Sequence, residues 1–546
     1  MVAVRVAYTY IKDDGVIKNV FPGVRDLDQT DVFGLRASLL LKPSETFKAI
    51  LRFTHSSSTG APAAAYATDI DFAGAGFPSL AAVPGSDRAG LGFFKNNQPL
   101  RGSQKLKSDG VNLRLDWNLG DAVDLTSVTT YDEAKWIRFQ EGGGLPLSLA
   151  PLYEDGKDIS QFVQEVRLAG GDAGFQWLVG GFYGRDSIFV TSYYPWMTDP
   201  RCGAECDFWL GGGGIGFVST NAFRQKRQSY AAFARGEYEL TPGLTLALGG
   251  RYSRDEIRRS DLIAFIGDSA APELIQTIGA PADGGPLAQR RNFERFTGEA
   301  TLSWAASDDV NAYASFKQGY RSGAFNAFVF LIDDATIAPP ETADNFELGI
   351  KSQFLDRRVT FNLAGFYTKY KNQQVISAEN GTFPLRRVDR ARIWGLEADL
   401  TVRPVSALTL NASLGYTNPK YLRGMIAGID VSGNQITNAA KWAVNVGADW
   451  TMADLGDGSV TLHVDARHQS RVFFDINNTP SIGDGGYTVA NAQLSFNMRS
   501  WDFELWGSNL TNTRYANYGV SLQSYGFSYL NRGTPRQFGA RVRHRF

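Results

Sequence analysis

The last ten residues of the chain, 537–546, place apolar and basic side chains on opposite faces of one extended strand, because side chains alternate between the two faces. One face carries Phe538, Ala540, Val542 and Phe546, and the other carries Gln537, Arg541, Arg543 and Arg545. A soluble core does not tolerate such a strand, since each buried and unpaired guanidinium group costs roughly several kcal/mol. The wall of a transmembrane β-barrel accommodates it, with lipid on one face and a wet lumen on the other. We therefore predict that this segment is the final strand of such a barrel.

The same alternation recurs along the whole chain, in segments of about ten residues, which is the length that a tilted strand needs to cross a bilayer. The first four segments are 4–10, 33–41, 47–54 and 111–117, and further ones follow as far as 501–511. Together with the final strand they make about twenty strands, an even number, as in single-chain bacterial barrels. The predicted fold class is all-β, a transmembrane antiparallel β-barrel.

The connections between these strands alternate between short and long. Short turns include 118–121, 170–173 and 241–243, whereas the long connections are 186–226, 258–293, 321–341, 419–440 and 512–535. Outer-membrane barrels have this asymmetry, with short periplasmic turns and long extracellular loops. The alternative is a large soluble β-protein, such as an array of sandwiches or a solenoid. Charged inward faces argue against that alternative, and a solenoid would also need a fixed repeat, which the sequence lacks.

Composition removes other classes of protein. The net charge is −1, from 55 basic and 56 acidic residues, so the chain has no bulk attraction for nucleic acid or for an anionic membrane surface. No window of the sequence offers the roughly 18 uninterrupted apolar residues that a membrane-spanning helix requires. The 546 residues contain no linker rich in Pro or Ser, so we predict one β-domain over residues 1–546.

Several stretches go beyond generic barrel patterning. They are 312–326, which contains Gly319-Tyr320-Arg321-Ser322-Gly323, then 340–352, 362–372, 391–400, 505–515, which contains Gly507-Ser508-Asn509-Leu510, and 533–536. In this order and at this spacing, they closely resemble the barrel of TonB-dependent outer-membrane receptors. The resemblance covers essentially the whole chain.

The resemblance implies active uptake of a small nutrient across the outer membrane of a Gram-negative bacterium. The ligand of such receptors is most often a ferric siderophore or a similar iron complex, and sometimes cobalamin, haem or a carbohydrate. In the family, an N-terminal plug fills a 22-stranded barrel, and the inner-membrane TonB complex pulls on that plug. Because residues 1–8 already alternate like a barrel strand, we expect the signal peptide, the TonB-contacting segment, the plug and the first two strands to be missing from this chain.

One long loop carries aromatic candidates for ligand binding. They are Tyr193, Tyr194, Trp196 and Trp209, together with the cation Arg201. Aromatic rings stack on catecholate or aryl groups, and a guanidinium group pairs with the negative charge of a ferric complex. The alternative is that the rings pack the loop onto itself or belong to the aromatic girdle at the membrane interface.

Two further places carry candidates of the same kind. Tyr525 and Tyr529 lie in a second aromatic loop, where the same two interpretations apply. Arg321 and Asn326 lie just beyond a strand end in the stretch with the best family resemblance, and either role, in the loop structure or in ligand contact, is open.

The only two cysteines, Cys202 and Cys206, lie four residues apart with no histidine nearby. This favours a local disulfide in an oxidising compartment over a metal site. No arrangement of Ser, His and Asp suggests an enzyme, and we predict neither a cofactor nor a metal ion. The expected partners are the iron complex, the TonB complex and outer-membrane lipid, and not nucleic acid. Inward charges of both signs leave a passive, plugless porin-like channel as the main alternative function.

Overall fold

The computed structural model describes residues 1–62, 64–120, 122–206, 217–268, 276–277, 287–327, 329, 335–379 and 383–545. Within these residues, one antiparallel sheet contains 21 strands, of which β13 (Gln276–Thr277) has only two residues. The long strands are β1 (Val2–Asp13), β3 (Thr30–Leu41), β4 (Phe47–Gly60), β7 (Ser103–Gly120), β8 (Val123–Glu141), β9 (Pro151–Gly171), β10 (Phe175–Trp196), β11 (Phe217–Thr241), β12 (Leu244–Asp268), β14 (Leu287–Ser307), β15 (Val310–Arg321), β18 (Glu341–Phe354), β19 (Val359–Ile376), β20 (Leu385–Val405), β21 (Leu408–Arg423), β24 (Trp442–Asp454), β25 (Gly458–Phe473), β26 (Gly483–Met498), β27 (Trp501–Ser508) and β30 (Gln537–His544). The expected count of about twenty strands is confirmed.

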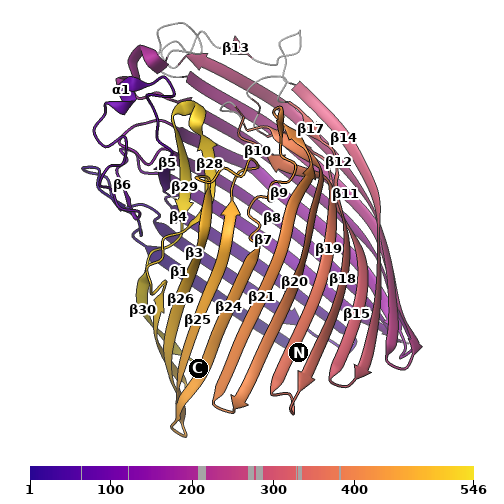
Figure 1. Cartoon of the computed structure of the whole chain (residues 1–546). Coiled ribbons are helices and arrows are strands. Elements are labelled where there is room, and N and C mark those ends of the chain that lie inside the picture. Colours follow the sequence, from indigo (N-terminus) through magenta and orange to yellow (C-terminus); the bar gives the residue numbers. More distant parts are fainter. Residues whose placement is uncertain are drawn as a thin grey trace.

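Each long strand pairs with the next one along the chain, and Figure 1 shows the resulting sheet rolled into a barrel of tilted strands. β1 pairs with β3, and β30 pairs with β27. Within the described part of the chain no pairing joins β1 to β30, so each of these two strands has one unpaired edge. No described helix is long and apolar enough to span a bilayer.

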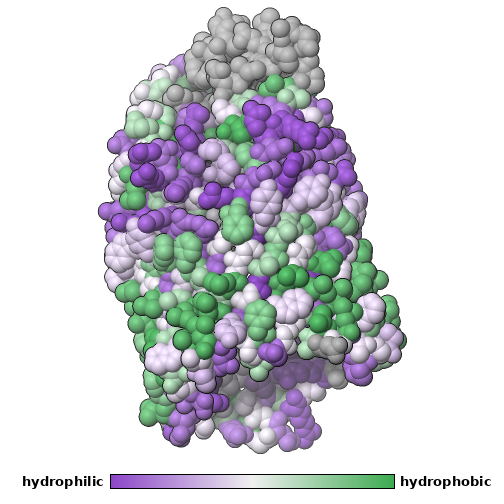
Figure 2. Space-filling model, turned by 90° about the vertical axis from the view of Figure 1, so that its right-hand side faces the viewer, coloured by the Kyte–Doolittle hydropathy of each residue, from purple (hydrophilic) through white to green (hydrophobic). Residues whose placement is uncertain are grey.

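Register between neighbouring strands keeps the apolar side chains on one common face. Leu51 lies opposite Leu113, Val446 opposite Ala466, and Phe503 opposite Val542. This face is the exterior: Figure 2 shows hydrophobic residues gathered in the lower half of the outer surface and a hydrophilic band above them. The apolar exterior matches the lipid-facing belt of a membrane barrel.

The opposite face, which lines the lumen, carries ion pairs that join neighbouring strands or reach across one intervening strand. Arg235 contacts Glu299 at 2.7 Å, and Arg541 contacts Glu504 at 2.7 Å. Arg543 lies on this face as the alternation predicts, with a guanidinium nitrogen 3.7 Å from Asp502. Arg235, Glu299 and Arg541 stay partly exposed in the lumen, so their desolvation cost is low.

Short and long connections alternate as the sequence predicts, but the long loops begin later. β10 continues to Trp196 and β11 begins at Phe217, so much of 186–226 is a hairpin stem and not a loop. Likewise β12 continues to Asp268. The prediction of those loop bounds was wrong, because backbone pairing continues beyond the lipid belt whereas the apolar half of the alternation ends with it. We call the end with long loops the loop end and the other the turn end.

Small elements at the loop end join segments that are distant in sequence. β5 (Ala65–Thr68), β29 (Phe527–Arg532) and β28 (Ala516–Leu522) form a three-stranded sheet, near the top of Figure 1. The remaining described elements are β2 (Lys18–Asn19), β6 (Lys95–Asn96), β16 (Ala324–Phe325), β17 (Ile337–Ala338), β22 (Met425–Ile426), β23 (Ile429–Asp430), α1 (Pro78–Ala81) and the 3-10 helices η1 (Pro200–Cys206) and η4 (Gln523–Tyr525). Loops from the two ends of the chain thus cap one side of the barrel together.

Candidate functional site

The two aromatic loops that the sequence singles out meet in one buried cluster at the loop end. Trp196 stacks on Tyr525, with ring centroids 5.3 Å apart and planes 17° apart, and Tyr194 lies parallel to Trp196 at 6.4 Å. Phe527 and Leu147 complete the same core, and all of these side chains are buried. Burial raises the pKa of Tyr525 to about 12. We call this group, with the residues packed around it, the loop-end core.

Arg201 lies in the loop that follows β10 and links it to the segment around Pro146. Its guanidinium group pairs with Asp199 at 2.7 Å and donates to the carbonyl of Pro146 at 2.5 Å, while Asp199 also accepts from the N–H of Ser148 at 2.9 Å. Burial pushes the pKa of Asp199 upwards, but the hydrogen bonds from Arg201 and from backbone N–H groups outweigh it and leave the pKa below its usual value. Arg201 therefore holds two loop segments together in this structure.

Glu141, at the loop end of β8, is a buried carboxyl group beside the same segments. Its Oε1 accepts from the N–H groups of Gly143 and Ala150 at 3.1 and 3.3 Å. Burial raises its pKa to about 7, and the nearby charge of Asp199 adds to the effect. This residue was not among the sequence-predicted candidates, since nothing in its local sequence indicates burial.

The other aromatic candidates lie at the margin of the loop-end core. Tyr193 is 40% exposed on the outer face of β10, with its ring 5.8 Å from that of Tyr153. Tyr529 is partly buried against the core, and burial raises its pKa. The structure therefore brings Tyr194, Trp196 and Tyr525 together and leaves Tyr193 outside.

Arg321 and Asn326 differ sharply in accessibility. The Arg321 side chain is 66% exposed at the loop end of β15, on the lumen face, and lies 3.8 Å from Glu341. Asn326 is only 1% exposed: its Oδ1 accepts from the N–H of Leu385 at 3.3 Å, and its carbonyl accepts from Arg259. Arg321 is thus available to a ligand in the lumen, whereas Asn326 holds loops in place.

Trp209 lies outside the described residues, as does the side chain of Cys206. Cys202 is disulfide-bonded, and the chain contains only two cysteines. Among the described residues, no group of three or more His, Cys, Asp or Glu side chains could hold a metal ion.

A buried network of arginines at the loop end also has no signal in the local sequence. Arg532 of β29 donates to Asn96 Oδ1 at 2.8 Å and lies 5.3 Å from the centre of the Tyr66 ring, on which Arg88 stacks at 4.2 Å. Burial lowers the pKa of Arg532 to about 10, and the neighbouring charge of Arg88 acts in the same direction. The network ties the loop between β4 and β7 to β29, across more than 400 residues of sequence.

These features define the class of protein. A large antiparallel barrel with an apolar exterior, a charged lumen and long loops at one end is the architecture of outer-membrane transport proteins. The chain belongs to the TonB dependent receptor-like, beta-barrel family, which matches residues 44–510.

Curated relatives are distant in sequence. The ferric-pyoverdine M114 receptor PbuA of Pseudomonas sp. strain M114 is 25% identical over 329 residues, which are 58% of this chain and 36% of that protein. The pesticin receptor of Yersinia enterocolitica is 22% identical over 392 residues, 70% of this chain and 51% of that protein. The chain thus aligns with between 36% and 51% of the length of these relatives.

Solved structures match the fold over the whole chain. The ferric yersiniabactin uptake receptor FyuA from Yersinia pestis superposes with a TM-score of 0.76 at 17% identity, over 100% of this chain and 75% of that one. The siderophore receptor PiuA from Acinetobacter baumannii gives 0.72 at 17% identity, over 99% and 76%. The copper transporter OprC gives 0.68 at 13% identity, over 100% and 76%, so the fold by itself does not identify the transported ligand.

Proposed function

We propose that this chain forms the barrel of an outer-membrane receptor that imports a ferric siderophore or a similar iron complex, with energy from the inner-membrane TonB complex. The main support for this proposal is that three proteins similar to this chain, PbuA, FyuA and PiuA, are all named as receptors for siderophores or ferric siderophores. We assign no covalent chemistry to the chain, since the matched family and these neighbours are transport receptors.

Within this proposal, Arg321 contacts the iron complex. Its guanidinium group is exposed on the lumen face at the loop end, and ferric siderophores that carry negative charge pair well with guanidinium groups. The rings of Tyr194, Trp196 and Tyr525 are buried against one another, so they reach a ligand only if the loops open. Tyr193, Arg201, Trp209, Asn326 and Tyr529 remain predictions.

We also propose that a plug fills the lumen and that two further strands pair with the free edges of β1 and β30. Two considerations support this. Unpaired backbone groups facing lipid cost roughly several kcal/mol each, which favours added strands. Lumen charges such as Arg235 and Glu299 offer hydrogen bonds to a plug. Reading the gene upstream of the Met1 codon tests the idea: an open frame with two alternating segments and a plug supports it, and an immediate stop codon contradicts it.

Uptake of iron-55 complexes by the native host tests the function. We expect deletion of the gene to abolish uptake of one siderophore class, and deletion of the TonB complex to abolish the same uptake. Arg321→Ala should lower the apparent affinity for that complex, whereas Arg357→Ala at the turn end, which removes an equally exposed cation, should not. Unchanged uptake in the deletion strain, together with ion conductance of the purified protein in planar bilayers, would instead identify a porin-like channel.

A further inference from the structure

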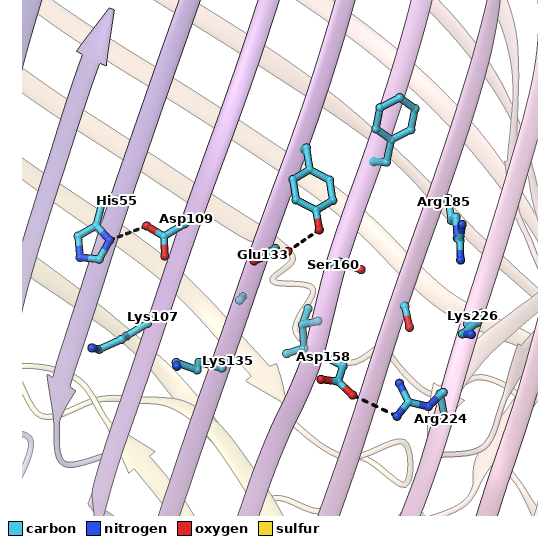
Figure 3. A pocket seen from close by; sticks show the side chains of 15 residues that line it. His55, Lys107, Asp109, Glu133, Lys135, Asp158, Ser160, Arg185, Arg224 and Lys226 are labelled. Atoms are coloured by element: carbon cyan, nitrogen blue, oxygen red, sulfur yellow. Dashed lines mark hydrogen bonds and ion pairs between the residues drawn. The ribbon is translucent and has the colours of Figure 1, made fainter.

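A hollow lined by charged side chains lies on the outer wall of the barrel, on strands β4 and β7 to β11. Its volume is about 840 Å³, and Figure 3 shows side chains from adjacent strands pointing into it. Six basic side chains line it: His55, Lys107, Lys135, Arg185, Arg224 and Lys226. We call it the outer-wall pocket.

Strand register places this pocket on the face that meets lipid lower down. His55 follows Phe53 by two positions on β4, and their partners on β7 are Asp109 and Val111. Because residues two apart share a face, His55 and Asp109 point outwards, as do Phe53 and Val111 of the apolar belt. Lys107 continues the same face one step further towards the loop end.

A row of outward aromatic rings separates the apolar belt from the charged side chains of the pocket. Tyr131, Phe162, Tyr183 and Tyr230 lie side by side on β8 to β11, with centroids 6.1 Å apart for Phe162 and Tyr183 and 5.2 Å apart for Tyr183 and Tyr230. Aromatic residues of membrane proteins concentrate at the level of the lipid headgroups. Tyr131 and Phe162 of this row line the lower edge of the pocket, and its charged side chains begin two residues further on, for example with Glu133 after Tyr131. These charges therefore lie at the outer edge of the headgroup layer.

The carboxylates of the pocket already have partners. Asp109 contacts His55 at 2.7 Å, Asp158 contacts Arg224 at 3.1 Å, and Glu133 accepts from the hydroxyl of Tyr131. Lys107, Lys135, Arg185 and Lys226 make no ion pair with any described residue, whereas Glu133 is bonded only to a neutral hydroxyl and keeps its negative charge. Lysine and arginine side chains still outnumber the carboxylates that line the pocket. An excess of positive charge therefore faces outwards at this level.

A β-bulge in β9 shapes the floor of the pocket. The register of β9 shifts against both of its neighbours near Asp158, whose φ is +49°. A bulge bends its strand and redirects a side chain, and here it brings Asp158 to Arg224 on β11. The bulged backbone of β9 therefore helps to form the pocket between Lys135 and Lys226.

We propose that the outer-wall pocket binds the phosphate groups of a lipid headgroup in the membrane leaflet at the loop end. Adjacent strands are about 4.8 Å apart, so cations from β7 to β11 span roughly 20 Å, enough for a headgroup with more than one phosphate. Juxtamembrane cations are attracted to anionic lipid, and the acyl chains of a lipid bound here would lie on the apolar belt directly below. The proposal requires the barrel to span a membrane but does not depend on the ligand that it transports.

Binding of fluorescent bis-phosphoryl lipid A to the purified protein in neutral detergent tests the proposal. We expect the Kd to rise at least about tenfold when Lys107, Lys135, Arg185 and Lys226 are all replaced by Gln, because each cation near the headgroups contributes to binding. A matched control replaces four exposed turn-end arginines, Arg357, Arg358, Arg403 and Arg499, by Gln and should leave the Kd within about twofold. Heat-dependent gel mobility confirms that both variants are folded.

Three results would overturn the proposal. One is an unchanged Kd in the pocket variant, and another is an equal loss in the turn-end control, which would mean that only overall charge matters. The third is complete competition by inorganic phosphate at low millimolar concentration, which would identify a site for free phosphate and not for a lipid. Weaker binding of a mono-phosphoryl lipid and none of a neutral phosphatidylcholine would support it.

Discussion

The barrel wall and the loop-end core differ in what covers their apolar side chains. In the wall, Leu348 is 68% exposed, and its apolar surface is left for lipid to cover. In the loop-end core, Leu147 is 0% exposed and is covered by other side chains of the chain. The wall therefore needs only the two-residue alternation, whereas the core needs specific partners from distant loops.

Polar groups follow the same division. Ion pairs of the wall, such as Arg541 with Glu504, line the lumen, where the Arg541 side chain is 56% exposed and can exchange its partner for another polar group. Asp199 and Glu141 lie in a dry environment, where a lost partner leaves an uncompensated polar group. We therefore expect the same type of substitution to lower stability more in the loop-end core than in the wall. The exception is a substitution that places a charge on the lipid face.

The largest effect should come from Trp196→Ala, which removes a ring stacked on Tyr525 and leaves a cavity. Such truncations cost roughly 3–5 kcal/mol in a protein core. Hydrogen exchange should accelerate in both aromatic loops while the wall strands stay protected. Trp450→Ala on the outer face of β24 is the matched control and should leave loop exchange unchanged. Equal exchange in the two variants would contradict the division between wall and core.

On the lipid face, Val446→Arg should be nearly as severe. Val446 lies between the outward Trp442 and Trp450 of β24, near the middle of the apolar belt, where an added arginine costs roughly 2–4 kcal/mol. Asn445→Arg, one residue away on the lumen face, should cost far less. Urea unfolding in lipid vesicles measures both, and a similar midpoint for the two variants would refute the assignment of the faces.

Glu141 should make the stability of the loop-end core, but not that of the wall, depend on pH. Its folded-state pKa of about 7 lies above the unfolded value, so the folded state binds the extra proton. Stability of the loop packing is then fully present below about pH 4.5 and is lost as the pH rises to about 7, by up to roughly 3 kcal/mol. Loop exchange measured from pH 4 to pH 8 should follow this trend, and Glu141→Gln should flatten it. A variant with the wild-type slope would exclude Glu141 as the cause.

Arg201→Gln should weaken the loop-end core more modestly. It removes the ion pair with the buried Asp199 but leaves the hydrogen bond from Ser148, so we expect a loss of roughly 1–2 kcal/mol. Faster proteolysis of segment 142–150 would report it. Arg499→Gln breaks an exposed pair with Asp457 at the turn end and should change stability by less than about 0.5 kcal/mol. Equal effects would mean that burial of Asp199 does not matter.

The smallest effect should come from Arg543→Leu in the last strand. The residue is exposed to the lumen, and its partner Asp502 also contacts Arg545 at 2.7 Å, so the carboxylate keeps a cation. We expect a stability change within about 0.5 kcal/mol. A clear gain in stability in lipid vesicles would indicate that residue 543 faces lipid, which would reverse the register of β30.

The strands could be located from the sequence because every strand of a membrane barrel obeys the same two-residue alternation. The hairpin stems above the belt, such as 186–196, were not recognised, because outward residues there, such as Ser187, are polar and no longer mark the lipid face. The burial of Glu141 and the contact of Arg532 with Asn96 were not predicted either. The residues next to Glu141 and Arg532 in the sequence do not distinguish them from exposed charged residues. Two aromatic loops were identified separately, but nothing local indicated that Trp196 would stack on Tyr525.

The sequence by itself determined the all-β class, the number of strands, the face of each strand and the alternation of turns and loops. The physical reason is that the two-residue period and the change from lipid to water act on each side chain where it stands. Only the tertiary structure decided which loops pack together, which polar groups are buried and where cations from different strands form the outer-wall pocket. Those properties depend on strand register and on contacts across hundreds of residues, and no local pattern encodes them.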